Sequence, residues 1–150
     1  MTDVQYFLLA RHAEATQDGT FSAIGAGIGG ITTPEIPVLL PMLFVLARLS
    51  LEREELGLAH NIAVRVLDPT GSQLFASENY DVARNEELSP DRELLLANLV
   101  LGLQNLVFPI FGVYMFELLF DGETVKATRF RVELRTPPKS SEMPEAKVSE

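Results

Sequence analysis

The alternation of apolar and polar residues is clearest over residues 105–134, on both sides of Asp121-Gly122. A period of two is typical of a strand with one buried face, and an Asp-Gly pair between two such runs predicts a tight hairpin turn. The predicted buried face consists of Tyr114, Phe116, Leu118 and Phe120 before the turn, and Thr128, Phe130, Val132 and Leu134 after it. Because two strands alone are only marginally stable in water, a second layer is expected to cover this aromatic face.

The same alternation predicts further strands along the chain. They are expected over residues 4–12, 21–32, 42–52, 59–67 and 72–80. Between the last two, Asp68-Pro69-Thr70-Gly71 predicts a β-turn, because proline is favoured at the second position and glycine at the fourth. Three prolines predict an irregular connection over residues 33–41, and the polar stretch 81–91 is predicted to be a loop.

Residues 92–103 carry two overlapping periodicities. Leu95, Leu99 and Leu103 repeat every four residues, which would suit a helix that begins near Ser89-Pro90. The apolar residues at odd positions also alternate with their neighbours, which suits a strand. We favour the strand, because the pattern elsewhere in the chain is that of strands.

The whole pattern predicts an all-β fold of about eight strands without alternating helices. We expect an antiparallel two-sheet β-sandwich, immunoglobulin-like or jelly-roll-like, formed by residues 1–136. Residues 137–150 are polar, contain proline and lack an apolar face, so they are predicted to form a disordered tail.

Charge and composition narrow the range of partners. The net charge of -9 argues against nucleic acid and anionic membrane surfaces, and it is consistent with ordinary solubility. The apolar stretches 36–47 and 94–120 are interrupted by prolines or polar residues, so we interpret them as core and not as membrane spans. No basic region precedes an apolar run at the start, so no signal peptide is expected. With no cysteine in the chain, we place the protein in the cytoplasm.

Four segments of the chain resemble an uncharacterised bacterial β-sandwich family, a domain of unknown function. They are A-R-H-A followed by D-G-T-F-S-A-I-G-A-G; P-E-I-P-V-L-L-P with L-F-V-L-A-R-L-S; H-N-I-A-V-R-V-L-D-P-T-G; and F-P-I-F-G-V-Y-M-F-E-L-L-F-D-G. The resemblance covers roughly residues 4–134 and implies a β-sandwich. It implies no activity, and no functional residue is transferred from it.

Few residues suggest catalysis or metal binding. His60 opens a predicted strand and is expected to make a structural hydrogen bond to a neighbouring loop, while His12 is expected to form a solvated pair near Glu14. Tyr114 is expected to cap a loop carbonyl with its hydroxyl, as a corner tyrosine does. No cofactor is expected, because residues 25–30 lack the lysine and the following helix of a phosphate loop.

Acidic residues in the predicted turns raise the alternative of a calcium site. These residues are Asp18, Asp68, Asp81, Glu86, Glu87 and Asp121. Calcium takes carboxylate and carbonyl oxygens, but the residues lack the spacing of a calcium-binding loop. We therefore predict no metal site and no effect of calcium on stability.

A run of small residues in the predicted strand 21–32 is the candidate interface. Because side chains alternate along a strand, Ala23, Gly25, Gly27 and Gly29 are expected to share a face that carries almost no side-chain bulk. Such a strip allows close approach by another part of the chain, by a partner protein or by a second copy. We therefore predict a non-enzymatic binding or assembly module that acts through protein–protein contact. The alternatives are a ligand- or calcium-binding sandwich and an enzyme with an unrecognised site.

Overall fold

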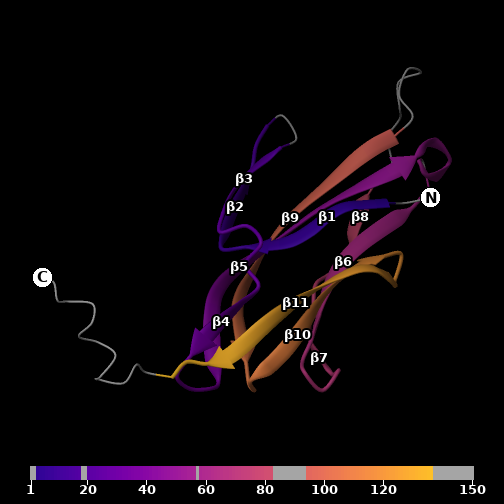
Figure 1. Ribbon diagram of the computed structural model, residues 1–150. Coiled ribbons are helices and arrows are strands. Elements are labelled where there is room, and N and C mark those ends of the chain that lie inside the picture. Colours follow the sequence, from indigo (N-terminus) through magenta and orange to yellow (C-terminus); the bar gives the residue numbers. More distant parts are fainter. Residues whose placement is uncertain (1–2, 18–19, 57, 83–93, 137–150) are drawn as a thin grey trace, which may run out of the picture.

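The computed structural model describes residues 3–17, 20–56, 58–82 and 94–136, and this part of the chain is all-β (Figure 1). The strands are β1 (Asp3–Ala10), β2 (His12–Ala15), β3 (Phe21–Ile24), β4 (Gly30–Thr33), β5 (Val38–Glu52), β6 (His60–Leu67), β7 (Gln73–Ala76), β8 (Tyr80–Val82), β9 (Leu94–Phe108), β10 (Gly112–Phe120) and β11 (Glu123–Leu134). A single turn of 3₁₀ helix, η1 (Arg53–Glu55), follows β5. The prediction of about eight strands was too low, because three of the predicted strands are each divided into two.

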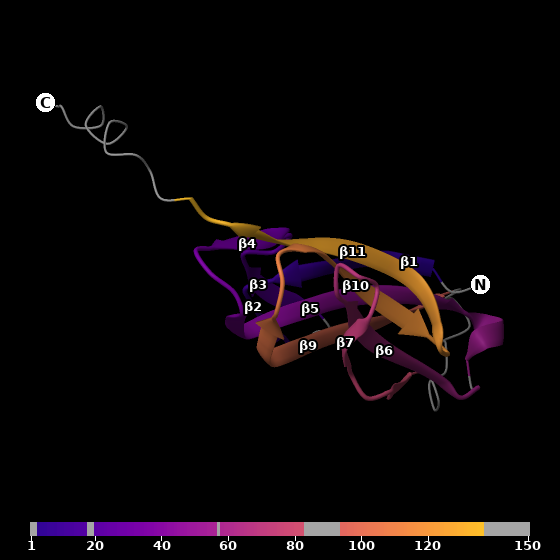
Figure 2. The same cartoon turned by 90° about the horizontal axis from the view of Figure 1, so that it is seen from below.

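Three sheets contain these strands. The largest has the order β4-β11-β10-β6-β7, with β8 also paired to β6, and it curls into a half-barrel (Figure 2). The second has the order β1-β5-β9, and the third is the β2–β3 hairpin. β4 pairs with β11 in parallel, with Gly30 opposite Arg131 and Thr33 opposite Leu134. The prediction of a purely antiparallel fold is therefore wrong at this edge.

The two larger sheets bury one shared core between them. The largest side chains that are fully buried include Phe108, Tyr114, Phe116 and Phe130. The rings of Phe108 and Phe130 stack with centroids 5.4 Å apart, and Phe116 meets Phe130 edge to face at 5.7 Å. The predicted apolar face of the hairpin is thus the core face, as alternation along a strand requires. Leu134 is an exception, since it lies at the strand end and is 59% exposed.

The β10–β11 hairpin turns where the sequence predicts. Asp121 and Gly122 both have positive φ, 52° and 86°, as the tight turn of a two-residue hairpin requires. The hairpin begins at Gly112, because residues 105–108 belong to β9 and not to the hairpin. The turn over Asp68–Gly71 is also confirmed, by a hydrogen bond of 2.9 Å from the Gly71 amide to the Asp68 carbonyl.

β5 and β9 are each 15 residues long and pair along their whole length. This confirms the strand prediction for residues 94–103. The predicted irregular connection over residues 33–41 is wrong from Val38 onward, because β5 continues through Pro41. Pro41 and Asn105 are left out of the register between the pairs Leu40–Leu106 and Met42–Gln104. Asn105 has a φ of 55°, and both strands exchange their buried and exposed faces at this point.

The β2–β3 hairpin forms a third layer on the outer face of the β1-β5-β9 sheet (Figure 1). A small apolar cluster lies beneath it, centred on the buried residues Ala10, Ala13 and Leu46. Among the described residues, no helix has the length and apolar character to span a membrane. The predicted tail, residues 137–150, lies outside the described residues.

Candidate functional site

The glycine-rich segment does not form the single strand that the sequence predicts. Ala23 lies in β3, while Gly25, Gly27 and Gly29 lie in the connection between β3 and β4. Gly25 and Gly27 have φ values of 67° and 86°, a left-handed conformation that breaks the alternation of a strand. The four residues therefore do not share one strand face, and an interface over them stays a prediction.

Glycine is required at two positions of this segment by close contacts within the chain. A Cβ atom on Gly25 would lie 2.8 Å from the Cγ and Cδ atoms of Arg11, and one on Gly30 would overlap the carbonyl oxygen of Arg131. At Gly27 and Gly29 a Cβ atom would meet nothing within 4 Å. The close approach predicted from the glycines is thus intramolecular at two positions, while two others face open space.

Backbone hydrogen bonds hold this connection between β1 and β11. The Gly27 amide donates to the Leu9 carbonyl at 2.7 Å, the Arg11 amide donates to the Ile24 carbonyl at 3.0 Å, and the Arg131 amide donates to the Gly29 carbonyl at 2.9 Å. The segment therefore brings Arg11 and Arg131, 120 residues apart in sequence, to one shallow hollow of about 520 Å³. We call it the arginine hollow; it is lined by Arg11, Gly29, Gly30, Ile31, Thr32, Arg131 and Glu133.

β9 is the other unusual surface feature. It contains no charged residue and no proline over its 15 residues, and it pairs with β5 alone in the part of the chain that the structure describes. Leu94 and Leu96 on this strand are each 44% exposed. Long apolar edge strands are rare on soluble proteins, because their free backbone groups can pair with another chain.

The other sheet edges are shorter or interrupted. β4, β7 and β8 have four, four and three residues. β1 carries Asp3, has a register shift between Val4 and Tyr6, and accepts the Gly27 amide at Leu9. These are common means of protecting an edge from pairing with another chain. β9 therefore stands out among the described strands as a long edge that lacks such protection.

Both histidines have the structural roles that the sequence predicts. The His60 ring contacts the Asp121 carboxylate with Nδ1 at 2.7 Å and the Glu55 carbonyl with Nε2 at 2.8 Å. Partial burial lowers the pKa of His60, but the hydrogen bonds to Asp121 and Glu55 outweigh it, so the pKa is raised above its ordinary value. His12 lies 3.3 Å from the Glu14 carboxylate at the exposed surface. The two rings belong to different sheets, and each is partnered locally.

The predicted role of Tyr114 is confirmed. Its ring is buried in the core, and its hydroxyl donates to the Ile110 carbonyl at 2.7 Å and accepts from the Ile110 amide at 3.2 Å. Among the acidic turn residues, Asp68 accepts hydrogen bonds from the amides of Thr70 and Ser72. No group of three or more metal-ligating side chains occurs within the described ranges of the chain.

Sequence reasoning missed both the arginine hollow and the β9 edge. Arg129, Arg131 and Glu133 alternate with the predicted core residues of the hairpin, which indicates exposure, but nothing local to them indicates Arg11 as a neighbour. The absence of charge in β9 was visible in the sequence and was interpreted as burial. Only the strand order places β9 at the edge of its sheet.

Comparisons with known proteins identify a family and no activity. A protein-family model described as a family of unknown function (DUF6941) matches residues 5–133. No curated protein matches the sequence. A solved structure described as the C-terminal domain of wzt is similar with a TM-score of 0.38 at 9% identity, over 91% of this chain and 75% of that chain. A likeness this distant indicates neither an activity nor a ligand for this chain.

Proposed function

The chain belongs to a family of unknown function (DUF6941), and we propose that it is a non-enzymatic assembly module that pairs with a second copy of itself through β9. The observation that carries this proposal is the long edge strand without charge or proline, unpaired on one side among the described residues. The domain that presents this strand is, in our interpretation, a β-sandwich whose two larger sheets share one core. The cytoplasmic location and the bacterial origin stay predictions.

The chemistry of β9 favours a second copy as the occupant. The chain carries a net charge of -9, so two copies repel one another wherever their acidic surfaces meet. β9 contributes no charge to that repulsion. Antiparallel pairing of two β9 strands about a two-fold axis would join the three-stranded sheets into one continuous sheet of twice the width. The free backbone groups of both edges would then be satisfied.

Pairing between copies is expected over residues 94–104. In this part of β9 the side chains alternate regularly, with Leu94 and Leu96 on the outer face. At Asn105 the buried and exposed faces of β9 are exchanged. A partner strand that continued to pair beyond this residue would place apolar side chains on the exposed face of the joined sheet. The paired segment would be long enough for several pairs of backbone hydrogen bonds, as in other cases of strand addition.

Sedimentation velocity over a concentration series tests this proposal. The parent chain is expected to sediment as a dimer, and Leu96→Lys is expected to weaken association by roughly tenfold or more, because it adds a long charged side chain to the pairing edge of each copy. Raising the salt concentration should strengthen association of the parent, since it screens the repulsion between acidic copies. A parent chain that stays monomeric at about 100 µM would overturn the proposal.

Two control variants distinguish β9 from the other exposed apolar positions. Ile24 on β3 is 67% exposed beside the glycine segment, and Val125 on β11 is 39% exposed. Ile24→Lys and Val125→Lys should both leave the dimer intact. Loss of the dimer in Ile24→Lys but not in Leu96→Lys would assign the interface to the segment that contains Ala23, Gly25, Gly27 and Gly29.

A further inference from the structure

The arginine hollow lies beside a second, more apolar hollow on the other side of β11. The second hollow has a volume of about 360 Å³ and is lined by Phe111, Gly112, Val113, Arg131, Val132, Glu133 and Leu134. Arg131 and Glu133 line both hollows, so these two residues separate a cationic surface near β4 from an apolar surface near β10. We propose that the two hollows together bind a small organic anion, with its carboxylate or phosphate at Arg11 and Arg131 and its apolar group against Phe111 and Val113.

The cations of this region are available for a ligand. Neither Arg11 nor Arg131 lies within 4 Å of a carboxylate in the described parts of the chain, whereas Arg65, on the same sheet as Arg131, pairs with Glu117. A guanidinium group presents a planar set of donors that fits a carboxylate or a phosphate with two parallel hydrogen bonds. In a chain of net charge -9, two arginines at one hollow are a local exception that favours an anion.

The shape of the site follows from its glycines. Gly29 and Gly30 contribute no side chain to the arginine hollow, and the backbone of Gly30 lies against that of Arg131. A Cβ atom on Gly30 would collide with the Arg131 backbone, whereas one on Gly29 would meet no atom within 4 Å. The volumes of the two hollows lie in the range of small-molecule sites, which combine an apolar surface with a few polar groups.

Glu133 sets the charge balance of the site. Two arginines and one glutamate leave one net positive charge, so a simple anion is attracted to Arg11 and Arg131 and repelled by Glu133. Changes at Arg131 and at Glu133, two residues of the same strand, should therefore alter the affinity for an anion in opposite directions. Removing the charge of Arg131 should weaken the binding of an anion, while removing the charge of Glu133 should strengthen it.

Titration of the ¹⁵N-labelled full chain with inorganic phosphate and with phenyl phosphate tests the proposal by NMR. Both probes should shift the amides of residues 29–32 and 131–133 in a saturable way, and sodium chloride at equal ionic strength should not. Phenyl phosphate should bind at least about tenfold more tightly and should also shift Phe111 and Val113, because its ring buries apolar area. Equal affinity of both probes, or shifts that do not saturate, would overturn the proposal.

Three variants complete the test. Arg131→Gln should weaken the binding of phenyl phosphate by roughly tenfold, and Glu133→Gln should strengthen it by several-fold. Arg129→Gln is the matched control, because Arg129 is exposed on the same strand and lines neither hollow. The amide spectrum of each variant shows whether it is folded. An equal loss in Arg129→Gln and Arg131→Gln would show general attraction to a basic strand and would refute a built site.

Discussion

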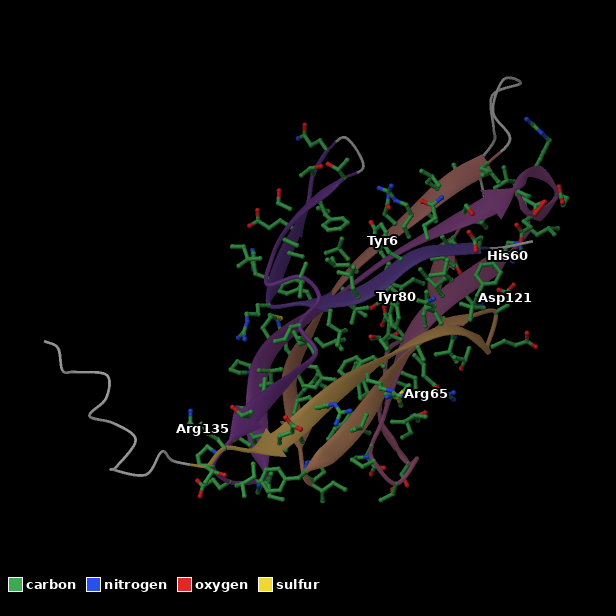
Figure 3. All side chains as sticks on the ribbon, viewed as in Figure 1. Tyr6, His60, Arg65, Tyr80, Asp121 and Arg135 are labelled. Carbon is green, nitrogen blue, oxygen red and sulfur yellow. The ribbon has the colours of Figure 1, made fainter. Side chains whose placement is uncertain are left out.

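His60 and Asp121 lie 2.7 Å apart between Nδ1 and Oδ2, although 61 residues separate them in the sequence (Figure 3). The other ring nitrogen of His60 faces the Glu55 carbonyl at 2.8 Å. A carboxylate and a carbonyl oxygen can only accept hydrogen bonds, so both ring nitrogens donate when the ring is protonated. The second carboxylate oxygen of Asp121 accepts the Asn61 amide at 2.9 Å. The contact thus ties the start of β6 to the β10–β11 turn and favours the imidazolium form.

The stability of the fold should depend on pH through His60. Its pKa is raised in the folded chain, so the contribution is fully present below the unfolded value, about 6.5, and is lost as pH rises through the raised pKa. His60→Gln removes the titrating group. Urea unfolding from pH 5.5 to pH 9 should show the parent losing stability relative to His60→Gln as pH increases. Parallel profiles would contradict this assignment.

The hydroxyl of Tyr114 should stabilise the connection between β9 and β10. Tyr114→Phe keeps the buried ring and removes both hydrogen bonds to Ile110. The loss is expected to be about 1–2 kcal/mol, because the Ile110 backbone is near enough to solvent to recover part of the bonding. Denaturant unfolding measures it, and a change below about 0.3 kcal/mol would show that the hydroxyl contributes nothing.

Tyr6→Phe is expected to have the opposite effect. The Tyr6 hydroxyl is buried and has no hydrogen-bond partner among the described residues, while its ring contacts Phe21 edge to face at 5.6 Å. Removing an unsatisfied buried hydroxyl should leave stability unchanged or raise it by up to about 1 kcal/mol. Thermal unfolding of this variant beside Tyr114→Phe compares the same chemical change at two sites. Equal destabilisation of both would refute the difference between their hydroxyl groups.

Phe116 and Phe130 should be energetically coupled. Both are fully buried on neighbouring strands, with ring centroids 5.7 Å apart. Truncation of either to alanine should lower the free energy of unfolding by about 3–5 kcal/mol. A double-mutant cycle should give a coupling of about 0.5–1.5 kcal/mol, as expected for an edge-to-face pair. If the double variant does not fold, Phe→Leu replacements give the same cycle with smaller losses.

Gly30 and Gly29 should differ sharply in their tolerance of alanine. A Cβ atom on Gly30 would overlap the Arg131 carbonyl and push β4 away from β11, so Gly30→Ala should cost about 1–3 kcal/mol. Gly29 faces open space without a left-handed φ, so Gly29→Ala should stay within about 0.5 kcal/mol. Gly27 would be a poorer control, since its φ of 86° strains any side chain whatever the space around it. Equal losses at Gly29 and Gly30 would contradict the close contact.

The sequence alone determined the features that depend on neighbouring residues. The core faces of β10 and of β11 as far as Val132, the Asp121-Gly122 turn and the structural roles of His60 and Tyr114 agree with the sequence prediction. Each follows from alternation along a strand or from the chemistry of a turn, which act over a few residues. The alternation rule gave the wrong result at Gly25 and Gly27. A run of small residues is compatible with a strand, and only the backbone φ values show that these two residues lie outside the β region of φ/ψ space.

The tertiary structure decided the strand order and everything that depends on it. Because pairing partners are chosen by packing between distant segments, no local pattern shows that β4 runs parallel to β11 or that β9 is an edge. An uncharged strand has the same composition at a sheet edge as at its centre, and so the sequence could not separate burial from an exposed pairing edge. Arg11 and Arg131 line one hollow for the same reason: only the strand order brings these two residues, distant in sequence, to the same place.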